Sequence, residues 1–342
     1  MKNIYGIEHK KLEQEMLALD QKAYRATQLF IWLYKKKAKS FEEMSDVAKA
    51  FRDKLAELYY FYLPKICVKQ EAYDGTIKLL VEMEDGAKVE TVLMRYNYGD
   101  AICVSSQVGC NMGCAFCASG QLKKKRNLTA GEMIGQVLVM NEILEAEGKQ
   151  VSHVVVMGTG EPFDNYDEVM DFIRILNDPK GLEIGARHIT VSTCGIPDKI
   201  RAYALEGLQV NLALSLHAPN DEIRNQLMPI NKAFPLKETI EAIRFYEKTT
   251  SRRVTFEYIM LKDINDSVEN ANKLAKLLRG ITAYVNLIPY NEVKGLPFSR
   301  SPRDNVNMFK DALKEAGVNT TVRKEFGKDI DAACGQLRAK KG

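Results

Sequence analysis

Apolar residues in the first 62 positions are spaced as in helices. They gather between Gln28 and Tyr34 and again between Ala48 and Tyr60, in blocks long enough for two or more helical turns. Ser40 and Ser45 precede the second block, and a serine hydroxyl can cap the first turn of a helix. We therefore expect residues 1–62 to form a small helical accessory domain.

The pattern then changes to short runs rich in β-branched residues. Ile77–Met83 and Lys88–Met94 flank the turn residues Asp85-Gly86, which predicts a β-hairpin. We expect residues 63–100 to form this hairpin extension. Glu90 would lie on one face of the second strand, where a lone carboxylate usually faces solvent.

From residue 101 onward, short apolar runs alternate with longer amphipathic ones. The expected strands are Ile102–Ser105, His153–Met157, His188–Ser192, Val210–Leu216, Arg253–Met260 and Tyr284–Pro289. The expected helices are Ala130–Ala146, Asp167–Leu176, Pro197–Leu205, Leu236–Thr250, Val268–Leu278 and Arg303–Ala316. This alternation predicts parallel strands joined by right-handed crossovers. An eight-stranded barrel typically needs about 250 residues, so we expect an α/β fold with a partial (β/α)6 barrel over residues 101–328. A C-terminal segment, 329–342, would follow.

Composition adds limits to this picture. The chain has 342 residues with 46% hydrophobic and 27% charged positions and a formal net charge of +4, which is ordinary for a globular protein that has a substantial core. A run of about 18 apolar residues, as in a membrane span, is absent, and so is the apolar core of a signal peptide. The basic run Lys35–Lys37 is either a solvated helix end or a grip on RNA phosphates.

Three of the seven cysteines lie within eight residues. Cys110, Cys114 and Cys117 have the spacing C-x3-C-x2-C, which lets three thiolates converge on one 4Fe-4S cluster. Structural zinc would favour four ligands, and a disulfide framework would favour a short secreted chain. Three ligands leave one iron open to a small molecule. The motif resembles that of the radical S-adenosylmethionine (SAM) enzymes, in which SAM binds this iron and is cleaved to a 5′-deoxyadenosyl radical. Such a cluster, together with free thiols, favours a reducing cytoplasm.

Polar residues also follow the expected strands. In a barrel, ligands bind where parallel strands end, and the residues there are Gly160, Glu161, Ser192, Ser215, Leu216, His217 and Asn291. Any one of them could instead be a cap or turn residue, and His217 could be a core histidine. Their common position favours a ligand site.

Four longer motifs make the resemblance more specific. They are Cys103–Cys110, Ser215–Asn220, Met228–Asn231 and Asp329–Leu337. Together they resemble the bacterial dual-specificity RNA methyltransferases, and the similarity runs nearly from end to end. The resemblance implies methylation of carbon 2 of adenine 2503 in 23S rRNA and of adenine 37 in tRNA.

The resemblance also implies roles for residues outside the cluster. Cys334 would accept a methyl group from a first SAM molecule, and a radical from a second SAM would activate that methyl group. Glu90 would accept the carbon 2 proton, and Cys103 would release the RNA by forming a disulfide with Cys334. The seven strand-end residues would contact SAM. A donor such as flavodoxin or ferredoxin would reduce the cluster, and we expect a monomer that has no contact with a membrane.

Several alternatives remain open at this point. Related resistance enzymes methylate carbon 8 of the same adenine and share the cluster and both cysteines. A non-catalytic iron–sulfur RNA-binding protein, or a radical enzyme acting on a small metabolite, would also explain the cysteine motif. Cys334 could be a small buried residue, the usual fate of a free cysteine and the one we expect for Cys67 and Cys194.

Overall fold

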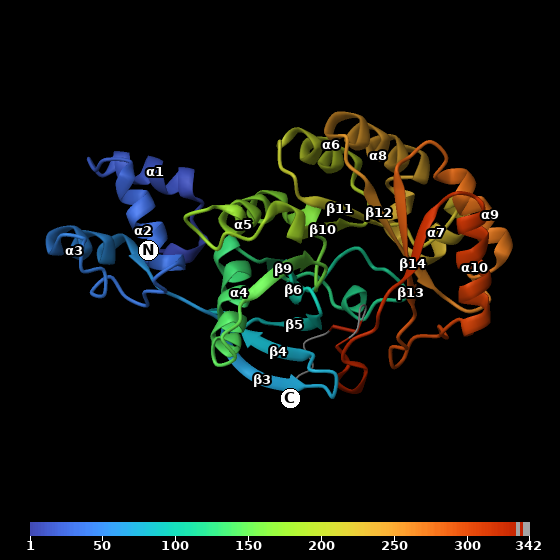
Figure 1. Ribbon diagram of the computed structural model, residues 1–342, viewed down its shortest axis with the longest axis horizontal. Helices are drawn as coiled ribbons and strands as arrows, with labels where there is room; N and C mark the ends of the chain where they lie inside the picture. Colours follow the sequence, from blue (N-terminus) through green and yellow to red (C-terminus); the bar gives the residue numbers. More distant parts are fainter. Residues whose placement is uncertain (333–335, 338–342) are drawn as a thin grey trace.

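The structure is a computed structural model that describes residues 1–332, 336 and 337 (Figure 1). Its centre is one curved sheet with the strand order β14-β13-β12-β11-β10-β9-β6-β5-β4-β3. Seven neighbouring strands run parallel: β6 (Gly99–Cys103), β9 (Val151–Val156), β10 (Ile189–Thr193), β11 (Asn211–Ser215), β12 (Val254–Met260), β13 (Ala283–Pro289) and β14 (Asn319–Val322). Because these strands are neighbours in chain order, their ends meet along one rim of an open barrel.

Helices cover the outer face of this sheet (Figure 1). They are α4 (Ala130–Glu145), α5 (Tyr166–Asn177), α6 (Pro197–Leu205), α8 (Leu236–Thr250), α9 (Val268–Leu277) and α10 (Arg303–Glu315). Alternate residues of each strand face opposite sides. In β9, Val154 and Val156 join the main core, whereas Val155 and the following Met157 border a separate apolar cluster on the inner side.

The strands and helices predicted from residue 101 onward are present, with ends that differ by at most three residues. Among the elements that had no prediction are one strand and one helix of the barrel. Strand β14 is only four residues long and reads Asn-Thr-Thr-Val, and helix α7 (Asp221–Leu227) has two turns. Neither is long enough to establish a hydrophobic period. The barrel therefore has a seventh parallel strand beyond the six expected.

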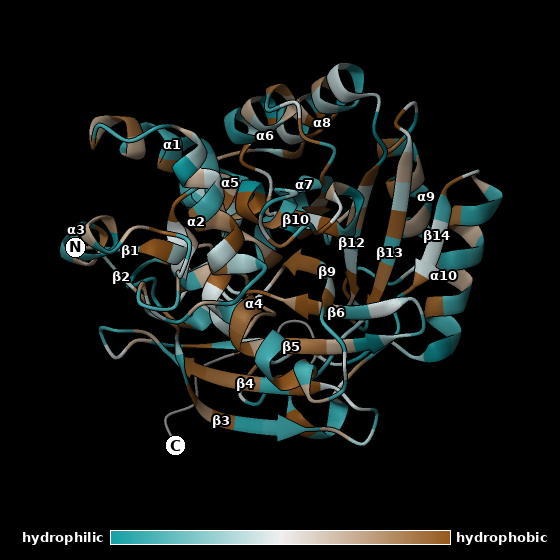
Figure 2. Ribbon diagram, turned by 60° about the vertical axis from the view of Figure 1, so that its left-hand side comes forward, coloured by the Kyte–Doolittle hydropathy of each residue, from teal (hydrophilic) through white to brown (hydrophobic). Residues whose placement is uncertain are grey.

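The predicted hairpin is part of a three-stranded meander. Strands β3 (Lys65–Glu71), β4 (Ile77–Glu82) and β5 (Lys88–Tyr96) are antiparallel, and β5 pairs with β6, so the extension continues the barrel sheet. Every residue of the edge strand β3 is exposed, and β3 is largely hydrophilic in Figure 2 while β9 is largely hydrophobic.

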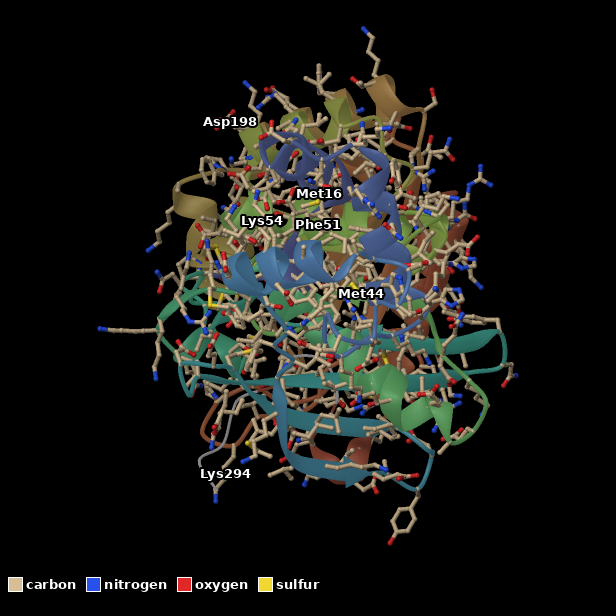
Figure 3. The ribbon with its side chains drawn as sticks, turned by 90° about the vertical axis from the view of Figure 1, so that its left-hand side faces the viewer. Met16, Met44, Phe51, Lys54, Asp198 and Lys294 are labelled. Carbon is tan, nitrogen blue, oxygen red and sulfur yellow. The ribbon has the colours of Figure 1, made fainter. Side chains whose placement is uncertain are left out.

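The accessory domain holds three helices, α1 (His9–Ala18), α2 (Tyr24–Tyr34) and α3 (Lys49–Leu58). A two-residue strand pair, β1 (Lys2–Asn3) with β2 (Tyr59–Tyr60), closes it. Met16, Met44 and Phe51, labelled in Figure 3, are buried in it. The serine caps were a wrong prediction: α3 begins after Ala48, and among the described residues no side chain caps its first turn.

The basic run after α2 contacts acidic residues of the barrel. The Lys37 ammonium lies 2.8 Å from a Glu145 carboxylate oxygen, and the Lys39 ammonium lies 2.7 Å from one of Glu142. Lys35 pairs with Glu183, and Lys36 lies over the Trp32 ring. These pairs tie the accessory domain to α4 and to the loop before β10. An RNA contact by this run stays a prediction, and it would compete with these pairs.

None of the helices in the described part of the chain has the length and apolar character needed to cross a membrane.

Candidate active site

The cysteine loop lies between two short strands, β7 (Gln107–Val108) and β8 (Arg126–Asn127), directly after β6. It folds tightly on itself: the Cys110 N–H donates to the Leu122 carbonyl over 2.9 Å. At Gly120 a side-chain Cβ would lie 2.6 Å from the Cys114 carbonyl oxygen, so the loop needs a glycine there. The Ala115 N–H donates to the Leu227 carbonyl, which anchors the loop on α7.

The three thiols of this loop border one cavity, which we call the cysteine-loop cavity. Burial raises the pKa of the Cys110 thiol to about 12 and that of Cys114 well above its usual value, and neighbouring thiols add to both shifts. Without a metal the two thiols are therefore neutral at pH 7, and metal binding must displace their protons.

The donor set fits a cluster better than a single ion. Within the described part of the chain, no three His, Cys, Asp or Glu side chains are arranged to hold one metal ion. A cubane separates its cysteine ligands further than one ion does, because each sulfur binds a different iron. Three buried thiols around a common cavity are thus compatible with a 4Fe-4S cluster.

Five of the seven predicted SAM contacts border the same cavity: Gly160, Glu161, Ser192, Ser215 and His217. They stand at the ends of three neighbouring parallel strands, β9, β10 and β11. The backbone at Gly160 has φ +116°, and a Cβ there would lie 2.7 Å from the Gln107 side chain. The glycine therefore allows the β9 loop to pack against the start of the cysteine loop.

Glu161 is a buried carboxylate at the wall of this cavity. One oxygen accepts from the Phe163 N–H over 3.1 Å and the other from the Cys194 N–H over 2.8 Å. Burial raises its pKa, although these hydrogen bonds oppose the shift. The backbone amides fix the carboxylate, and its remaining lone pairs can accept from an ammonium group.

His217 is also held in one orientation. Its Nδ1 accepts from the Ile259 N–H over 3.1 Å, and its ring packs edge-on against Phe116, with 4.9 Å between ring centroids. Burial lowers its pKa to about 3, so the ring is neutral at pH 7 and carries its proton on Nε2.

Leu216 differs from its neighbours. Its side chain is fully buried in the main core, its N–H donates to the Glu257 carbonyl, and its carbonyl accepts from Arg224. It is not among the residues that border the cysteine-loop cavity. A role in SAM binding would therefore come from positioning Ser215 and His217.

A second cavity adjoins the first, and we call it the Cys103 cavity. It is bordered by Cys103, Asn291, Val92, Met94 and by Phe326, Ala332 and Leu337 near the C-terminus. The two cavities share six residues: Cys117, Ser119, Met157, Gly158, Ile288 and Arg323. The cysteine loop, five of the predicted SAM contacts, Asn291 and Cys103 therefore border one continuous region. Cys334 lies outside the described residues, but Ala332 and Leu337 on either side of it border this second cavity.

Glu90 is not solvent-facing, in contrast to the prediction for a lone strand carboxylate. Only 6% of its surface is exposed, and its carboxylate lies 3.4 Å from the Lys78 ammonium. It is two residues along β5 from Val92, which borders the Cys103 cavity. Glu90 itself is not one of the described residues that border the two cavities.

Sequence reasoning missed three charged residues at this site. Arg224 of α7 is fully buried and donates to the carbonyls of Leu216, Ser215 and Cys194. Glu257 and Arg323 border the cysteine-loop cavity as an ion pair 3.7 Å apart. The signal was present for Glu257, a lone carboxylate within the apolar run of β12.

The two unassigned cysteines have different environments. Cys194 is buried as predicted, and it also borders the cysteine-loop cavity. Cys67 on the edge strand β3 is exposed, so its predicted burial was wrong.

The chain is similar to known proteins over nearly its full length. Residues 104–275 match the radical SAM superfamily, and residues 2–60 match the ribosomal RNA large subunit methyltransferase N-terminal domain. A probable dual-specificity RNA methyltransferase RlmN of Spiroplasma citri is 53% identical over 340 residues, which cover 99% of this chain and 98% of the relative. The protein of the same name in Streptococcus thermophilus is 53% identical over 342 residues, 98% of this chain and 88% of the relative.

A solved structure has the same fold. The radical SAM methyltransferase from Sphaerobacter thermophilus superposes with a TM-score of 0.93 at 43% identity, and the match covers 99% of this chain and 100% of that one. The curved parallel sheet and the cysteine loop define a radical SAM enzyme. Within that superfamily, the chain belongs to the family of dual-specificity RNA methyltransferases.

Proposed function

We propose that this protein methylates carbon 2 of adenine in 23S rRNA, at adenine 2503, and in tRNA, at adenine 37. One observation carries the proposal: Cys103, Ala332 and Leu337 border a cavity that shares six residues with the cysteine-loop cavity, and Cys334 stands between Ala332 and Leu337 in the sequence. A radical enzyme that acts on a small molecule would need no second thiol beside its cluster cavity. A pair of cysteines is what transfer through a protein-bound methyl group requires.

The residues present fit both groups that this reaction needs. Cys110, Cys114 and Cys117 would hold one 4Fe-4S cluster, and Gly160, Glu161, Ser192, Ser215 and His217 would surround SAM next to it. Asn291 would approach SAM from the adjoining cavity. When bound, cluster and SAM would supply the 5′-deoxyadenosyl radical that removes a hydrogen atom from a methyl group on Cys334.

The chain's own residues would carry the remaining steps. The Cys334 thiolate would take the methyl group from a first SAM by displacement, forming a carbon–sulfur bond as the methyl–sulfonium bond breaks and S-adenosylhomocysteine leaves. Once activated, the methyl carbon would bond to carbon 2 and join the RNA to the protein. Glu90 would accept the proton from carbon 2. The Cys103 thiolate would attack the Cys334 sulfur, break its bond to the methylene carbon and leave a disulfide. The methylene carbon would take up a proton to become the methyl group, and the unpaired electron of the adduct would pass to an oxidised electron carrier.

This cycle needs partners beyond the RNA. The disulfide must be reduced after each turnover, and the cluster needs an electron from a donor such as flavodoxin or ferredoxin. Both requirements favour a reducing cytoplasm. We propose that the protein works as a monomer, because Cys103, Ala332 and Leu337 border one cavity within a single chain.

The test is nucleoside analysis of RNA from an anaerobic reaction. Reconstituted, reduced protein would receive SAM and unmodified rRNA or tRNA fragments, and mass spectrometry would separate 2-methyladenosine from 8-methyladenosine. We expect 2-methyladenosine, and none from Cys334→Ala. Cys67→Ser is the matched control, because Cys67 is exposed on β3 and borders neither cavity. Formation of 8-methyladenosine would overturn the carbon 2 assignment, and SAM cleavage without either product would overturn the RNA assignment.

A further inference from the structure

One face of the β3–β5 meander buries a charge pair where its neighbours are apolar. Val92, Met94 and Cys103 on this face form an apolar cluster with Phe326, Ala332 and Leu337. Lys78 and Glu90 are part of the same face, and the side chain of each is 8% exposed. In the antiparallel register Lys78 stands opposite Val92, and Glu90 stands opposite Leu80, so the two charges are diagonal neighbours. Their ammonium and carboxylate lie 3.4 Å apart.

The Lys78 ammonium has a second partner from a distant part of the chain. It donates to the backbone carbonyl of Asp331 over 3.3 Å, three residues before Cys334. We call residues 326–332 with 336 and 337 the C-terminal segment. In Figure 1 the chain after β14 turns back to reach β4, as this contact requires. Lys78 therefore contacts the proposed proton acceptor and the segment that leads to the proposed methyl acceptor.

Other contacts hold the C-terminal segment at this place. The Gly327 N–H donates to Asp74 over 3.0 Å, and the Tyr73 N–H donates to Asp329 over 3.3 Å. On the far side of Cys334, the Ser119 hydroxyl donates to the Leu337 carbonyl over 2.6 Å. These three contacts fasten the segment, and Lys78 joins it to the Glu90 carboxylate.

We propose that Lys78 is a positioning residue for the proton-transfer step: it keeps Glu90 ionised and holds the C-terminal segment in register with it. This inference rests on the proposed function and deepens it. A buried ion pair contributes little net stability compared with apolar residues of the same size. A buried carboxylate without its cation would instead take up a proton, and it could then no longer act as a base.

The step itself is a proton transfer. The bond between carbon 2 and its hydrogen breaks, the proton bonds to a Glu90 oxygen, and the electron pair stays on the RNA–protein adduct. Lys78 remains charged and keeps its contact with the Asp331 carbonyl. The described charged and titratable groups nearest to Glu90 on the neighbouring elements are Lys78 of β4, the Glu82–Lys88 pair two residues along the same face, Cys103 of β6, and Asp331. Lys78 is the cation that is paired with Glu90.

The experiment compares Lys78→Met with Lys78→Arg in the reconstituted full-length protein. Lys88→Met is the matched control, because Lys88 on β5 pairs with Glu82 over 3.0 Å at an exposed position of the same hairpin. Three quantities would be followed from pH 6 to 9: methylation of Cys334 by mass spectrometry, the amount of RNA–protein adduct, and release of 2-methyladenosine in a single turnover. Hydrogen exchange of the C-terminal segment in the RNA-free protein gives a readout independent of activity.

We expect Lys78→Met to methylate Cys334 as wild type does. Release of methyladenosine near pH 7 should fall about tenfold or more, and the adduct should accumulate. Without the cation Glu90 ionises at higher pH. The rising limb of the pH–rate profile therefore moves to higher pH, and activity recovers in alkaline solution. Lys78→Arg should restore the wild-type profile within about threefold, since it keeps the charge. Exchange of the segment should speed up in Lys78→Met and stay unchanged in Lys88→Met.

A merely structural role would lower the rate equally at every pH, and this result would overturn the proposal. An unchanged pH–rate profile in a Lys78→Met protein that still methylates Cys334 would also overturn the proposal. If Lys78→Met fails to fold, Lys78→Met/Glu90→Gln removes both charges together, and its rate should match that of Glu90→Gln alone. Absence of 2-methyladenosine from the wild type would instead mean that the proposed function has failed.

Discussion

The two adjoining cavities of the active site are built from different parts of the fold. The cysteine-loop cavity lies at the ends of consecutive parallel strands, and its residues follow β6, β9, β10 and β11 in chain order. The Cys103 cavity lies between the meander and the C-terminal segment, so residues near 92 meet residues near 332. The first cavity is a product of the barrel itself, whereas the second exists only when the chain end returns to the sheet.

This difference separates two kinds of chemistry. A fixed rim suits cofactor binding, because strand ends position backbone and side-chain groups without further assembly. The Cys103 cavity brings together groups that we propose must act in turn on RNA and on each other. Damage to the rim should therefore affect every step that uses SAM or the cluster, and loss of Cys103 should affect only the release of the RNA.

The largest effect should come from a cluster ligand. Cys114→Ala removes one of the three buried thiols of the cysteine-loop cavity. We expect the iron content to fall and 5′-deoxyadenosine and methyladenosine to drop below detection, because every radical step needs the cluster. Cys194→Ala is the matched control, since Cys194 borders the same cavity and has no proposed ligand role. Iron retention with full activity in Cys114→Ala would remove Cys114 from the ligand set.

A change in the second cavity should be more selective. Cys103→Ala is expected to keep the cluster, SAM cleavage and methylation of Cys334, and to accumulate RNA joined to the protein, because the thiol that resolves the link is gone. Gel electrophoresis under denaturing conditions would detect the adduct. Free methyladenosine formed at the wild-type rate would contradict both the role of Cys103 and the contrast between the cavities.

Loss of a charge at the rim should weaken SAM binding without abolishing it. In Glu161→Gln the amide keeps the shape of the side chain but removes its negative charge and one of the two oxygens that accept from the Phe163 and Cys194 N–H groups. A hydrogen bond to a charged group is worth about 1.5–3 kcal/mol, so SAM affinity should fall roughly 10- to 150-fold as measured by calorimetry. Ser192→Ala serves as comparison, because it removes a neutral group from the same cavity. Equal losses in the two variants would mean that the Glu161 charge makes no special contribution.

The barrel and the cysteine motif could be predicted from the sequence because both depend on short-range patterns. The six strands carry an apolar period of their own, and the three thiols are close in the chain. Glu90 and Arg323 could not be placed in this way, since their surroundings come from segments far away in sequence. Glu90 pairs with Lys78, which in turn donates to the Asp331 carbonyl near the C-terminus, and Arg323 reaches Glu257 from 66 positions further along the chain. Position at a strand end correctly predicted most residues of the rim, but it was misleading for Leu216. Side chains alternate between the two faces of a strand, so every second one points into the core.

Replacing His217 should have a smaller effect, which is visible in the pH dependence of the free energy of unfolding. Its folded pKa of about 3 is below the ordinary value of 6.5, so the unfolded chain binds a proton first on acidification. Stability should therefore be complete above pH 6.5 and fall between pH 6.5 and 3, by up to about 1.4 kcal/mol per pH unit.

The His217→Asn variant isolates this contribution. An asparagine oxygen can replace Nδ1 as acceptor for the Ile259 N–H, and asparagine tolerates the φ of +59° at this position. Urea unfolding of the metal-free protein at several pH values should give a shallower acid slope for the variant. An identical slope would show that another group dominates acid unfolding.

The smallest effect should come from the accessory domain, which borders neither cavity. Lys37→Glu breaks an exposed pair with Glu145, and such pairs are worth about 1 kcal/mol or less. Stability should fall by no more than this, and less at high salt, while RNA affinity stays nearly constant because the lysine is already engaged with the protein. The charge swap Lys37→Glu/Glu145→Lys should restore stability.

RNA binding measured across salt concentrations tests whether the accessory domain takes part in RNA recognition. A large loss of affinity in Lys37→Glu, with a weaker salt dependence that the swap fails to restore, would mean that the lysine leaves Glu145 to bind a phosphate. The ion pairs between the domain and α4 would then be a resting state that RNA displaces, and recognition would begin in the part of the chain furthest in sequence from Cys334.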